Sequence, residues 1–332
     1  MIEALLAIDI GGSTSRAVLV DRQGNCLGLG RNGGGNPGSN PPELAAAAVV
    51  AAAAAAVAEV GAPLDIKVAV LAMAGPRHDD VRRLIEDGLR RLGLSGDLVL
   101  TSDTPAMLPS VTAATSGYCV FAGTGSGAIR VRDGEIDGVV DAAGWLLGDL
   151  GSGYWLGHQA AIAVTAALEG RGPATALSHA LLDRFGIADD ATRDRNGRPA
   201  SLQIFIDRIY RLRPIELAQF APLVLANPTD PVAAELLAQA EKYLVADFEH
   251  IFDPALRGPV VLGGSVAAKL GGLPRAIAAR LAAAGHEPDI RLAGDGAVGA
   301  AVLALRHQGV TVDAPLLHRI AASITSRTKA VT

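Results

Sequence analysis

The chain has 332 residues, of which half are hydrophobic and 19% are charged, with a formal net charge of −5. This length and composition exclude a disordered polyelectrolyte and predict a large core spread over two domains. The acidic balance argues against a general nucleic-acid binder, which would carry a basic surface. Two cysteines without CxxC spacing exclude a disulfide framework and a zinc ribbon, and the start has no basic leader. We therefore expect a cytoplasmic protein.

The first third of the chain has an α/β pattern. Its predicted elements, in chain order, are strands at 5–10, 16–20 and 25–30, a glycine-rich loop at 32–42, an alanine-rich helix at 44–58, a strand at 66–72, a helix at 79–92 and a strand at 98–100. The alanine tract is about fifteen residues long, whereas a membrane span needs roughly 20. We therefore predict a helix of a soluble domain there, and no membrane association.

The opening order of elements returns about 112 residues later. A strand at 118–122 ends in the run GTGSG, and two strands separated by an Asp-Gly turn follow it, as they do after the first strand. This repetition indicates a duplicated supersecondary unit. The remaining predicted elements are a mainly helical stretch at 153–252, strands at 260–264 and 290–293, each followed by a helical segment, and a C-terminal helix after residue 314 with a frayed polar tail.

We therefore predict an α/β protein of two duplicated lobes whose glycine turns face each other across a cleft. The expected division is a first lobe at 1–115, a second lobe at 116–310 with a helical insertion at about 153–253, and a final helix and tail at 311–332. The last helices are expected to pack back toward the first lobe.

Three predicted strands end in turns that combine glycine with serine or threonine, at 11–14, 123–127 and 263–265. Glycine lets the backbone approach a ligand closely, and consecutive N–H groups with hydroxyls suit phosphate oxygens. The GxGxxG run at 28–33 opens no helix, so it fails as a dinucleotide fingerprint. No Gly-Lys-Ser/Thr P-loop and no HExxH motif occurs. The three turns therefore predict phosphate binding.

A serine hydrolase is a weaker alternative. Ser265 lies between a strand and a helix in a G-x-S-x-A context, and Asp295 and either His307 or His318 follow in the Ser–Asp–His order of α/β-hydrolases. This interpretation leaves the duplicated turns unexplained, and no HGG-type oxyanion motif precedes the serine.

The motifs together resemble the N-acetylglucosamine kinase branch of the BadF/BadG/BcrA/BcrD-type ATPases, within the actin-like ATPase and sugar kinase superfamily. The similarity runs from Leu5 to about Leu305. Its most specific stretch is GWLLGDLGSGYWLGHQA at 144–160, which is similar to the GW…GDEGS.YW…HQA signature of that branch. The resemblance implies two actin-like, ribonuclease H-like lobes around a nucleotide and sugar cleft.

The resemblance also implies roles for individual residues. Asp103 would be the catalytic base that takes the proton of the sugar hydroxyl, although a helix N-cap is the simpler alternative. Asp9 would hold Mg²⁺ or its water shell. The implied sugar-binding residues are Asn36, Gly125, Ser126, Gly144, Trp145 and Asp149. The implied ATP-binding residues are Gly11, Gly12, Ser13, Thr14, Thr124, Gly263, Gly264, Ser265 and Lys269.

The implied activity is phosphoryl transfer from ATP to the 6-hydroxyl of N-acetylglucosamine or glucosamine by a homodimeric enzyme. Leu150 stands where the family signature has Glu, which puts the choice among hexosamines in doubt. Another hexosamine kinase, an ATPase that activates a radical dehydratase through a cysteine-held iron–sulfur cluster, and a non-catalytic sugar sensor are the alternatives within the resemblance.

Overall fold

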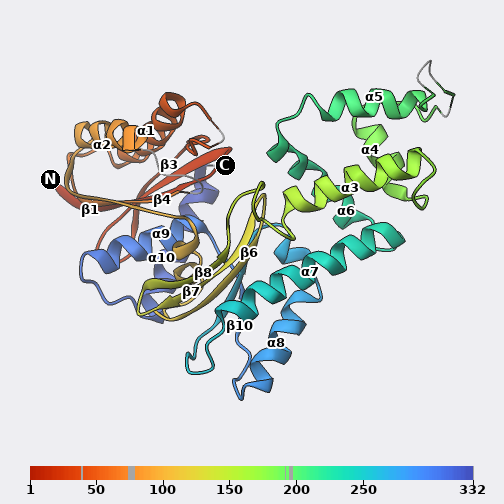
Figure 1. Ribbon diagram of the computed structural model, residues 1–332. Helices are drawn as coiled ribbons and strands as arrows, with labels where there is room; N and C mark the ends of the chain where they lie inside the picture. The colour runs from red at the N-terminus through yellow and green to blue at the C-terminus, as the bar shows by residue number, and fades with distance from the viewer. Residues whose placement is uncertain (39, 74–78, 191, 194–196, 332) are drawn as a thin grey trace. The chain divides into compact units, whose positions relative to one another are not determined.

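The computed structural model describes residues 1–38, 40–73, 79–190, 192–193 and 197–331, without the side chains of 330 and 331. It contains two compact units (Figure 1). The first comprises Met1–Gly117, Val131–Glu135 and Leu292–Thr332, and the second comprises Tyr118–Arg130 and Ile136–Arg291. Residues 292–310 therefore group with the first unit, whereas the sequence-based division places them in the second lobe.

The first unit is built on a five-stranded mixed sheet. Its strands are β1 (Ile2–Ile10), β2 (Thr14–Val20), β3 (Cys26–Gly33), β4 (Leu64–Met73) and β5 (Leu94–Thr101), in the order β3-β2-β1-β4-β5. β1 and β2 are antiparallel, as are β2 and β3, while β1, β4 and β5 run parallel. The α/β character and the strand positions predicted from the sequence are confirmed.

Helices cover both faces of this sheet (Figure 1). Leu6 and Ile8 of β1 pack with α1 (Pro42–Val60) and α2 (Asp79–Arg91). Leu5 and Ala7 point the other way, because successive side chains of a strand alternate, and they pack with α9 (Gly296–His307) and α10 (Ala314–Val331). This packing is why the last two helices belong to the first unit.

Two glycines of β3 allow α1 to lie unusually close to the sheet. A Cβ atom on Gly28 would lie 2.1 Å from the carbonyl oxygen of Ala56, and one on Gly30 would lie 2.0 Å from that of Ala52. Among the described residues, α1 is the one helix with the length and apolarity of a membrane span. Its alanine-rich face is buried in the core of this unit.

The second unit repeats the sheet topology. Its strands are β6 (Gly117–Ala122), β7 (Ser126–Arg132), β8 (Glu135–Asp141), β9 (Val260–Gly263) and β10 (Ile290–Leu292), in the order β10-β9-β6-β7-β8. In each sheet the strand that comes first in the chain, β1 or β6, is central. The next two strands lie on one side of it and the last two on the other. β6 pairs parallel with β9, as β1 does with β4. The predicted duplication is confirmed.

The insertion between β8 and β9 is helical, as the sequence predicts. Its helices are α3 (Gly153–Leu168), α4 (Ala176–Arg184), α5 (Ala200–Ile209), the 3₁₀ helix η3 (Pro214–Phe220), α6 (Ala221–Ala226) and α7 (Pro231–Ile251). The 3₁₀ helix η4 (Ala267–Lys269) and α8 (Leu273–Ala283) follow β9.

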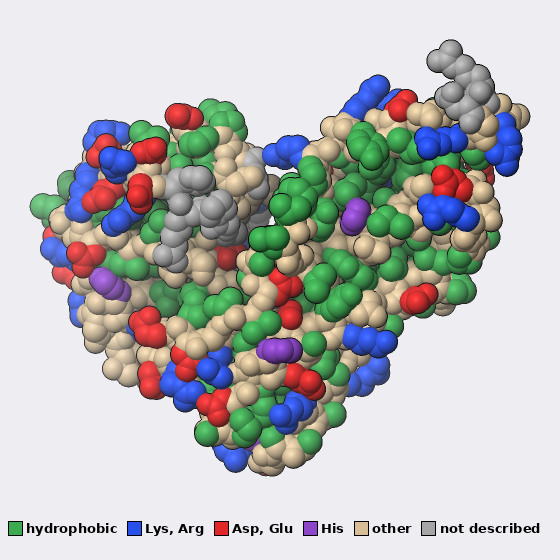
Figure 2. All heavy atoms as spheres, viewed as in Figure 1, with side chains coloured by type: hydrophobic (Ala, Val, Ile, Leu, Met, Phe, Trp, Pro, Cys, Tyr) green, Lys and Arg blue, Asp and Glu red, His purple; other side chains and the backbone are tan. Residues whose placement is uncertain are grey.

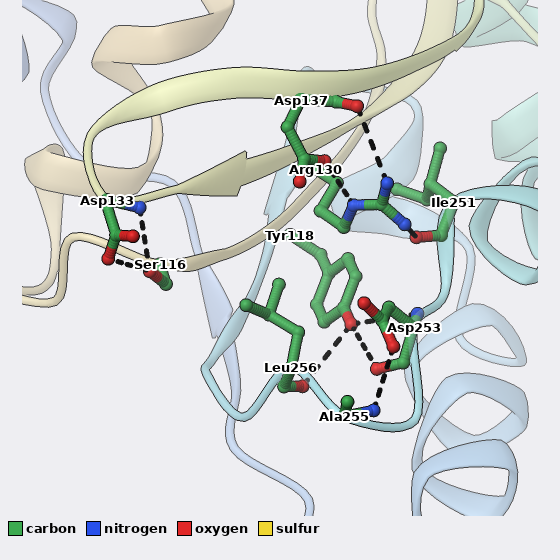
Figure 3. A network of polar contacts seen from close by, with 9 residues as sticks. All are labelled: Ser116, Tyr118, Arg130, Asp133, Asp137, Ile251, Asp253, Ala255 and Leu256. Carbon is green, nitrogen blue, oxygen red and sulfur yellow. Dashed lines mark hydrogen bonds and ion pairs between the residues drawn. The ribbon is translucent and has the colours of Figure 1, made fainter.

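A polar network fastens the end of α7 to the central strand of this sheet (Figure 3). The Tyr118 hydroxyl donates to the carbonyl of Asp253 at 3.0 Å and accepts from the N–H of the same residue at 3.1 Å. Arg130 pairs with Asp137 and donates to the carbonyl of Ile251 at 2.9 Å. These contacts fix the end of α7, and a Cβ atom on Gly151, in the loop before α3, would lie 2.8 Å from the Ala240 carbonyl oxygen of that helix.

Candidate active site

The turn between β1 and β2 is tied to the glycine-rich loop that follows β3. The Gly11 N–H donates to the carbonyl of Thr14 at 2.9 Å, which closes the turn. The Gly11 carbonyl in turn accepts the N–H groups of Gly35 and Asn36, each at 3.2 Å. Asn36, predicted to bind sugar, therefore lies directly beside the first predicted phosphate turn. Ser39 of this loop lies outside the described residues.

A group of carboxylates lies at the end of β1. Burial raises the pKa of Asp9 to about 6; the positive charge of Arg16 opposes this shift, and the negative charges of Asp295 and Asp103 add to it. Arg16 forms an ion pair with Asp295 at 2.5 Å. A Cβ atom on Gly296 would lie 2.7 Å from the Asp9 carboxylate, so glycine lets α9 begin against that carboxylate.

Asp103 follows β5 at the N-cap position of the short 3₁₀ helix η1 (Thr104–Ala106). It makes no side-chain capping hydrogen bond, and the helix N–H that acts on its carboxyl group is that of Thr104, the first residue of η1. Burial raises the pKa of Asp103, while the N–H groups of Asp103 and Thr104 oppose the shift. A buried carboxyl group with a raised pKa has the properties of a general base.

The second glycine turn, between β6 and β7, holds the start of α3. The Gly123 N–H donates to the Gly125 carbonyl at 2.8 Å. The carbonyls of Gly123 and Thr124 accept the N–H groups of Gly153 at 2.7 Å and Tyr154 at 3.1 Å. The first N–H groups of a helix have no partner within it, so these bonds fix the turn and the helix together.

The third turn follows β9 and meets the second one. Gly264 has φ +86°, and a Cβ atom there would lie 2.3 Å from the carbonyl oxygen of Ala122, so only glycine fits without strain. A pocket of about 140 Å³ opens beside these turns. It is lined by Gly123, Thr124, Gly153, Ala218, Ala221, Pro222, Leu225, Ser265, Val266 and Lys269. The structure thus brings Thr124, Ser265 and Lys269 together, as a shared ATP-binding role requires.

The sequence reasoning missed the apolar wall of this pocket. Ala221, Pro222 and Leu225 come from α6 and Ala218 from η3, both inside the helical insertion. An apolar wall opposite a phosphate turn suits the flat face of a nucleobase. The local sequence carries no signal for this role, because these residues look like ordinary helix core.

The loop from Asp141 to Ser152 contains the predicted sugar-binding residues Gly144, Trp145 and Asp149. The Asp149 carboxylate accepts the Ser126 N–H at 3.1 Å, and a Cβ atom on Gly125 would lie 2.8 Å from that carboxylate. Burial raises the pKa of Asp149, the Ser126 N–H opposes the shift, and the charge of Asp141 adds to it. The predicted set Gly125, Ser126 and Asp149 is therefore in direct contact.

Asp141 organises this loop, and the sequence reasoning did not identify it. Its carboxylate accepts the N–H of Asp149 at 2.7 Å and that of Leu150 at 2.9 Å. Asp141, Ala142 and Asp149 all have φ between +55° and +57°, a conformation rare for residues other than glycine and often found at functional sites.

Trp145 lies at the outer end of the loop, next to Gly144 with its φ of +80°. Its side chain is 38% exposed, and its ring centroid lies 5.8 Å from that of Tyr154.

Both backbone polar groups of Leu150 are hydrogen-bonded. Its N–H donates to the Asp141 carboxylate, and its carbonyl accepts the Ser126 hydroxyl at 2.8 Å. The side chain of Leu150 is 39% exposed.

Each unit thus carries one part of the predicted residue set. The first unit holds Asp9, Gly11, Gly12, Ser13, Thr14, Asn36 and Asp103. The second unit holds Thr124, Gly125, Ser126, Gly144, Trp145, Asp149, Gly263, Gly264, Ser265 and Lys269.

Among the residues that the structure describes, Asp295 and His307 do not form the acid–histidine pair of a hydrolase. Asp295 pairs with Arg16 and caps α9 by accepting the Ala297 N–H at 2.9 Å. His307 instead lies 3.0 Å from Asp97. The order of Ser265, Asp295 and His307 along the chain therefore has no matching Asp295–His307 contact.

The duplicated sheets, each with a glycine turn after its first strand, have the two-lobed α/β fold of the actin-like sugar kinases. The chain belongs to the BadF/BadG/BcrA/BcrD ATPase family, whose model matches residues 6–304.

Comparisons with individual proteins agree with this assignment. A curated relative from Clostridium acetobutylicum, an N-acetylmuramic acid/N-acetylglucosamine kinase, is 31% identical over 116 residues, which span 34% of this chain and 37% of that relative. The crystal structure of a candidate N-acetylglucosamine kinase from Chromobacterium violaceum matches with a TM-score of 0.71 at 26% identity, covering 92% of this chain and 99% of the other. A second such candidate, from Porphyromonas gingivalis, shares the fold with a TM-score of 0.65 at 20% identity, covering 93% and 100%.

Proposed function

We propose that this protein transfers the γ-phosphoryl group of ATP to the 6-hydroxyl of an amino sugar, with N-acetylglucosamine first and glucosamine second in order of preference. The observation that carries the proposal is the Asp141–Ser152 loop, in which Asp149 contacts both Gly125 and Ser126. This loop is the part of the chain that matches the signature of the N-acetylglucosamine kinase branch. The named activities of the Clostridium and Chromobacterium relatives support the same substrate class.

Asp103 would act as the base. A raised pKa makes its carboxylate a better proton acceptor. It would take the proton of the sugar hydroxyl as that oxygen attacks the γ-phosphorus. The bond from the γ-phosphorus to the bridging oxygen then breaks, and ADP leaves with the electron pair. Such transfer depends mostly on positioning and on charge stabilisation by the surrounding groups.

The nucleotide would be held by the pocket beside the second and third turns. Thr124 would contact phosphate, Ser265 and Lys269 would flank the adenosine, and the apolar wall from α6 would face the base. Gly11, Gly12, Ser13 and Thr14 of the first turn would contribute further phosphate contacts.

Mg²⁺ would be held through Asp9. Among the described residues no group of three or more His, Cys, Asp or Glu side chains could chelate a metal without other ligands. A single carboxylate fits Mg²⁺ nonetheless, since this ion keeps several waters and binds one or two carboxylates together with substrate phosphates. When bound, the ion would neutralise charge on the phosphates. The positive charge of Arg16 would favour the ionised form of Asp9 that Mg²⁺ requires.

The dehydratase-activator alternative lacks suitable cysteines. Such an activator needs thiols that can share an iron–sulfur cluster at an interface. Cys26 and Cys119 are both buried in strands, and burial raises the pKa of the Cys26 thiol, which disfavours the thiolate that a cluster requires. A purified protein that is brown and contains iron would revive this alternative.

We also propose a homodimer in the cytoplasm with no nucleic-acid or membrane partner. Acidic and basic side chains are mixed on the face seen in Figure 2, which suits a small-molecule enzyme. Analytical ultracentrifugation tests the dimer.

The experiment that tests the function is a coupled assay of ADP release across a panel of sugars. The panel contains N-acetylglucosamine, glucosamine, N-acetylmuramic acid, N-acetylmannosamine and glucose, each with ATP and Mg²⁺. We expect the highest kcat/KM with N-acetylglucosamine. Sugar binding without ADP release would instead support a non-catalytic sensor.

A further inference from the structure

A groove in the helical insertion opens beside the predicted sugar loop, all within the second unit. One wall is α3 and the other is formed by α5 and η3, and the enclosed volume is about 770 Å³. This volume lies within the range of small-molecule sites. The proposed reaction with a single hexosamine does not use this groove.

The groove is continuous with the sugar loop through Trp145, which lines it. From there, the ring of Trp145 is followed by those of Tyr154 and His158, which belong to α3. The centroids of Trp145 and Tyr154 are 5.8 Å apart, and Tyr154 stacks on His158 at 5.6 Å with an interplanar angle of 15°. Aromatic rings are rigid and can pack against the apolar face of a pyranose ring. The wall therefore suits a ligand built of sugar rings.

The polar groups of the groove suit a hydroxyl-rich ligand. Thr165, Glu169, Arg171 and Arg198 line it, and Glu169 and Arg171 form an ion pair with each other. Together they offer both acceptors and donors, and a sugar hydroxyl can use either.

Building on the proposed function, we propose that this groove binds a second sugar ring linked to the amino sugar that is phosphorylated. The enzyme then acts on amino-sugar disaccharides as well as on the monosaccharide. The reacting ring occupies the site of Gly125, Ser126 and Asp149, and the second ring continues past Trp145 along α3. Binding energy from this remote ring adds to kcat/KM without changing the phosphoryl-transfer step.

The substrate test compares N-acetylglucosamine with its β-1,4-linked disaccharide, N,N′-diacetylchitobiose. Wild-type protein is assayed for ADP release and, separately, for binding of each sugar by isothermal titration calorimetry. We expect the disaccharide to bind at least tenfold more tightly and to be phosphorylated with a higher kcat/KM. A disaccharide that binds no more tightly than the monosaccharide overturns the proposal.

The variant test fills the groove. Ile162 lines it from α3 and is 46% exposed, so Ile162→Trp adds bulk there without entering the core. Ile204 of α5 is equally exposed but is not part of the groove lining, so Ile204→Trp is the matched control. We expect Ile162→Trp to weaken disaccharide binding at least tenfold, to leave the monosaccharide within twofold, and Ile204→Trp to change neither.

The outcomes separate this proposal from the proposed function. If neither sugar is phosphorylated but Ile162→Trp selectively weakens disaccharide binding, the groove assignment stands and the kinase assignment fails. If Ile162→Trp weakens both sugars equally, the groove is not a separate subsite. If Ile162→Trp instead converts a wild-type dimer to monomer in sedimentation, the groove is an interface between two copies and the proposal is wrong.

Discussion

The carboxylate of Asp141 accepts the backbone N–H of Asp149 at 2.7 Å and so closes the loop between them. The Asp149 carboxylate in turn accepts the N–H of Ser126, the first residue of β7. A residue outside the predicted site thereby sets the backbone position of a residue within it. Because a carboxylate has two acceptor oxygens, Asp141 also holds the N–H of Leu150 at 2.9 Å.

Asp141→Asn is expected to raise the KM for the sugar roughly tenfold, since a hydrogen bond to a charged group contributes about 1.5–3 kcal/mol. Asparagine keeps one acceptor oxygen and tolerates the left-handed backbone, so the protein should still fold. The KM for ATP should stay within twofold. Asp133→Asn is the matched control, because Asp133 also has a positive φ but lies in the β7–β8 hairpin turn. Equal changes in both KM values would contradict a positioning role.

The carboxyl group of Asp247 in α7 should make the folding stability of the protein depend on pH. Burial and the charge of Asp141 raise its pKa to about 6, with His250 opposing the shift, and its Oδ2 atom is buried without a hydrogen-bond partner in the described structure. Because the folded state holds this proton more tightly than the unfolded state, the contribution of Asp247 to stability is greatest below the ordinary pKa of 3.8 and is lost as pH rises through about 6.

The check on Asp247 is the melting temperature between pH 4 and pH 8. Asp247→Asn removes the ionisation and should raise the melting temperature at pH 7 with little change at pH 4. Glu249→Gln, an exposed carboxylate on the same helix, serves as the control and should shift neither value. A stabilisation by Asp247→Asn that is equal at both pH values would rule out ionisation as its cause.

Leu150→Glu introduces the residue that the signature resemblance implies at this position and is expected to change sugar preference. The backbone N–H and carbonyl of Leu150 are both bonded and its side chain is 39% exposed, so the substitution should be tolerated. An added carboxylate should favour the protonated amine of glucosamine over the neutral N-acetyl group. We expect the ratio of kcat/KM for glucosamine to that for N-acetylglucosamine to rise roughly threefold to tenfold at low salt. Leu150→Gln controls for size, and an equal rise there would contradict the charge argument.

Substitutions of Lys269 and Ser265 distinguish a nucleotide-binding role of this pocket from a serine-hydrolase mechanism. Both line the pocket of about 140 Å³, where we propose that they flank the adenosine. Lys269→Ala should raise the KM for ATP about tenfold and leave the KM for the sugar unchanged. Ser265→Ala should keep most of kcat. Complete loss of activity in Ser265→Ala would favour the serine as a nucleophile.

Much of the fold could be predicted from the sequence because local patterns set it. The continuous apolar run of β1 and the glycine turns after β1, β6 and β9 are short-range features, and the second copy of the pattern makes the duplication visible. By contrast, the placement of α9 depends on packing across nearly the whole chain. Gly296 meets Asp9 and Ala297 joins the core around Leu5, and no local pattern encodes those partners.

The two glycines of β3 likewise have a role that the sequence alone does not reveal. Gly28 and Gly30 look like weak points in a strand, yet they are what allows α1 to pack against β3. Within the candidate site, the turns and the signature loop could be predicted as motifs. Asp141 and the α6 wall could not, because their roles depend on which backbone atoms lie next to them in space.

Asp103→Asn tests the central claim most directly. Wild-type and variant protein are mixed with ATP, Mg²⁺ and N-acetylglucosamine, and ADP and the phosphorylated sugar are both quantified, with ATP binding measured separately by calorimetry. The account predicts one sugar 6-phosphate per ADP in the wild type, and a loss of about 10²–10⁴-fold in kcat in Asp103→Asn with ATP affinity within twofold. Near wild-type turnover in Asp103→Asn, or ADP release without a phosphorylated sugar, would contradict it.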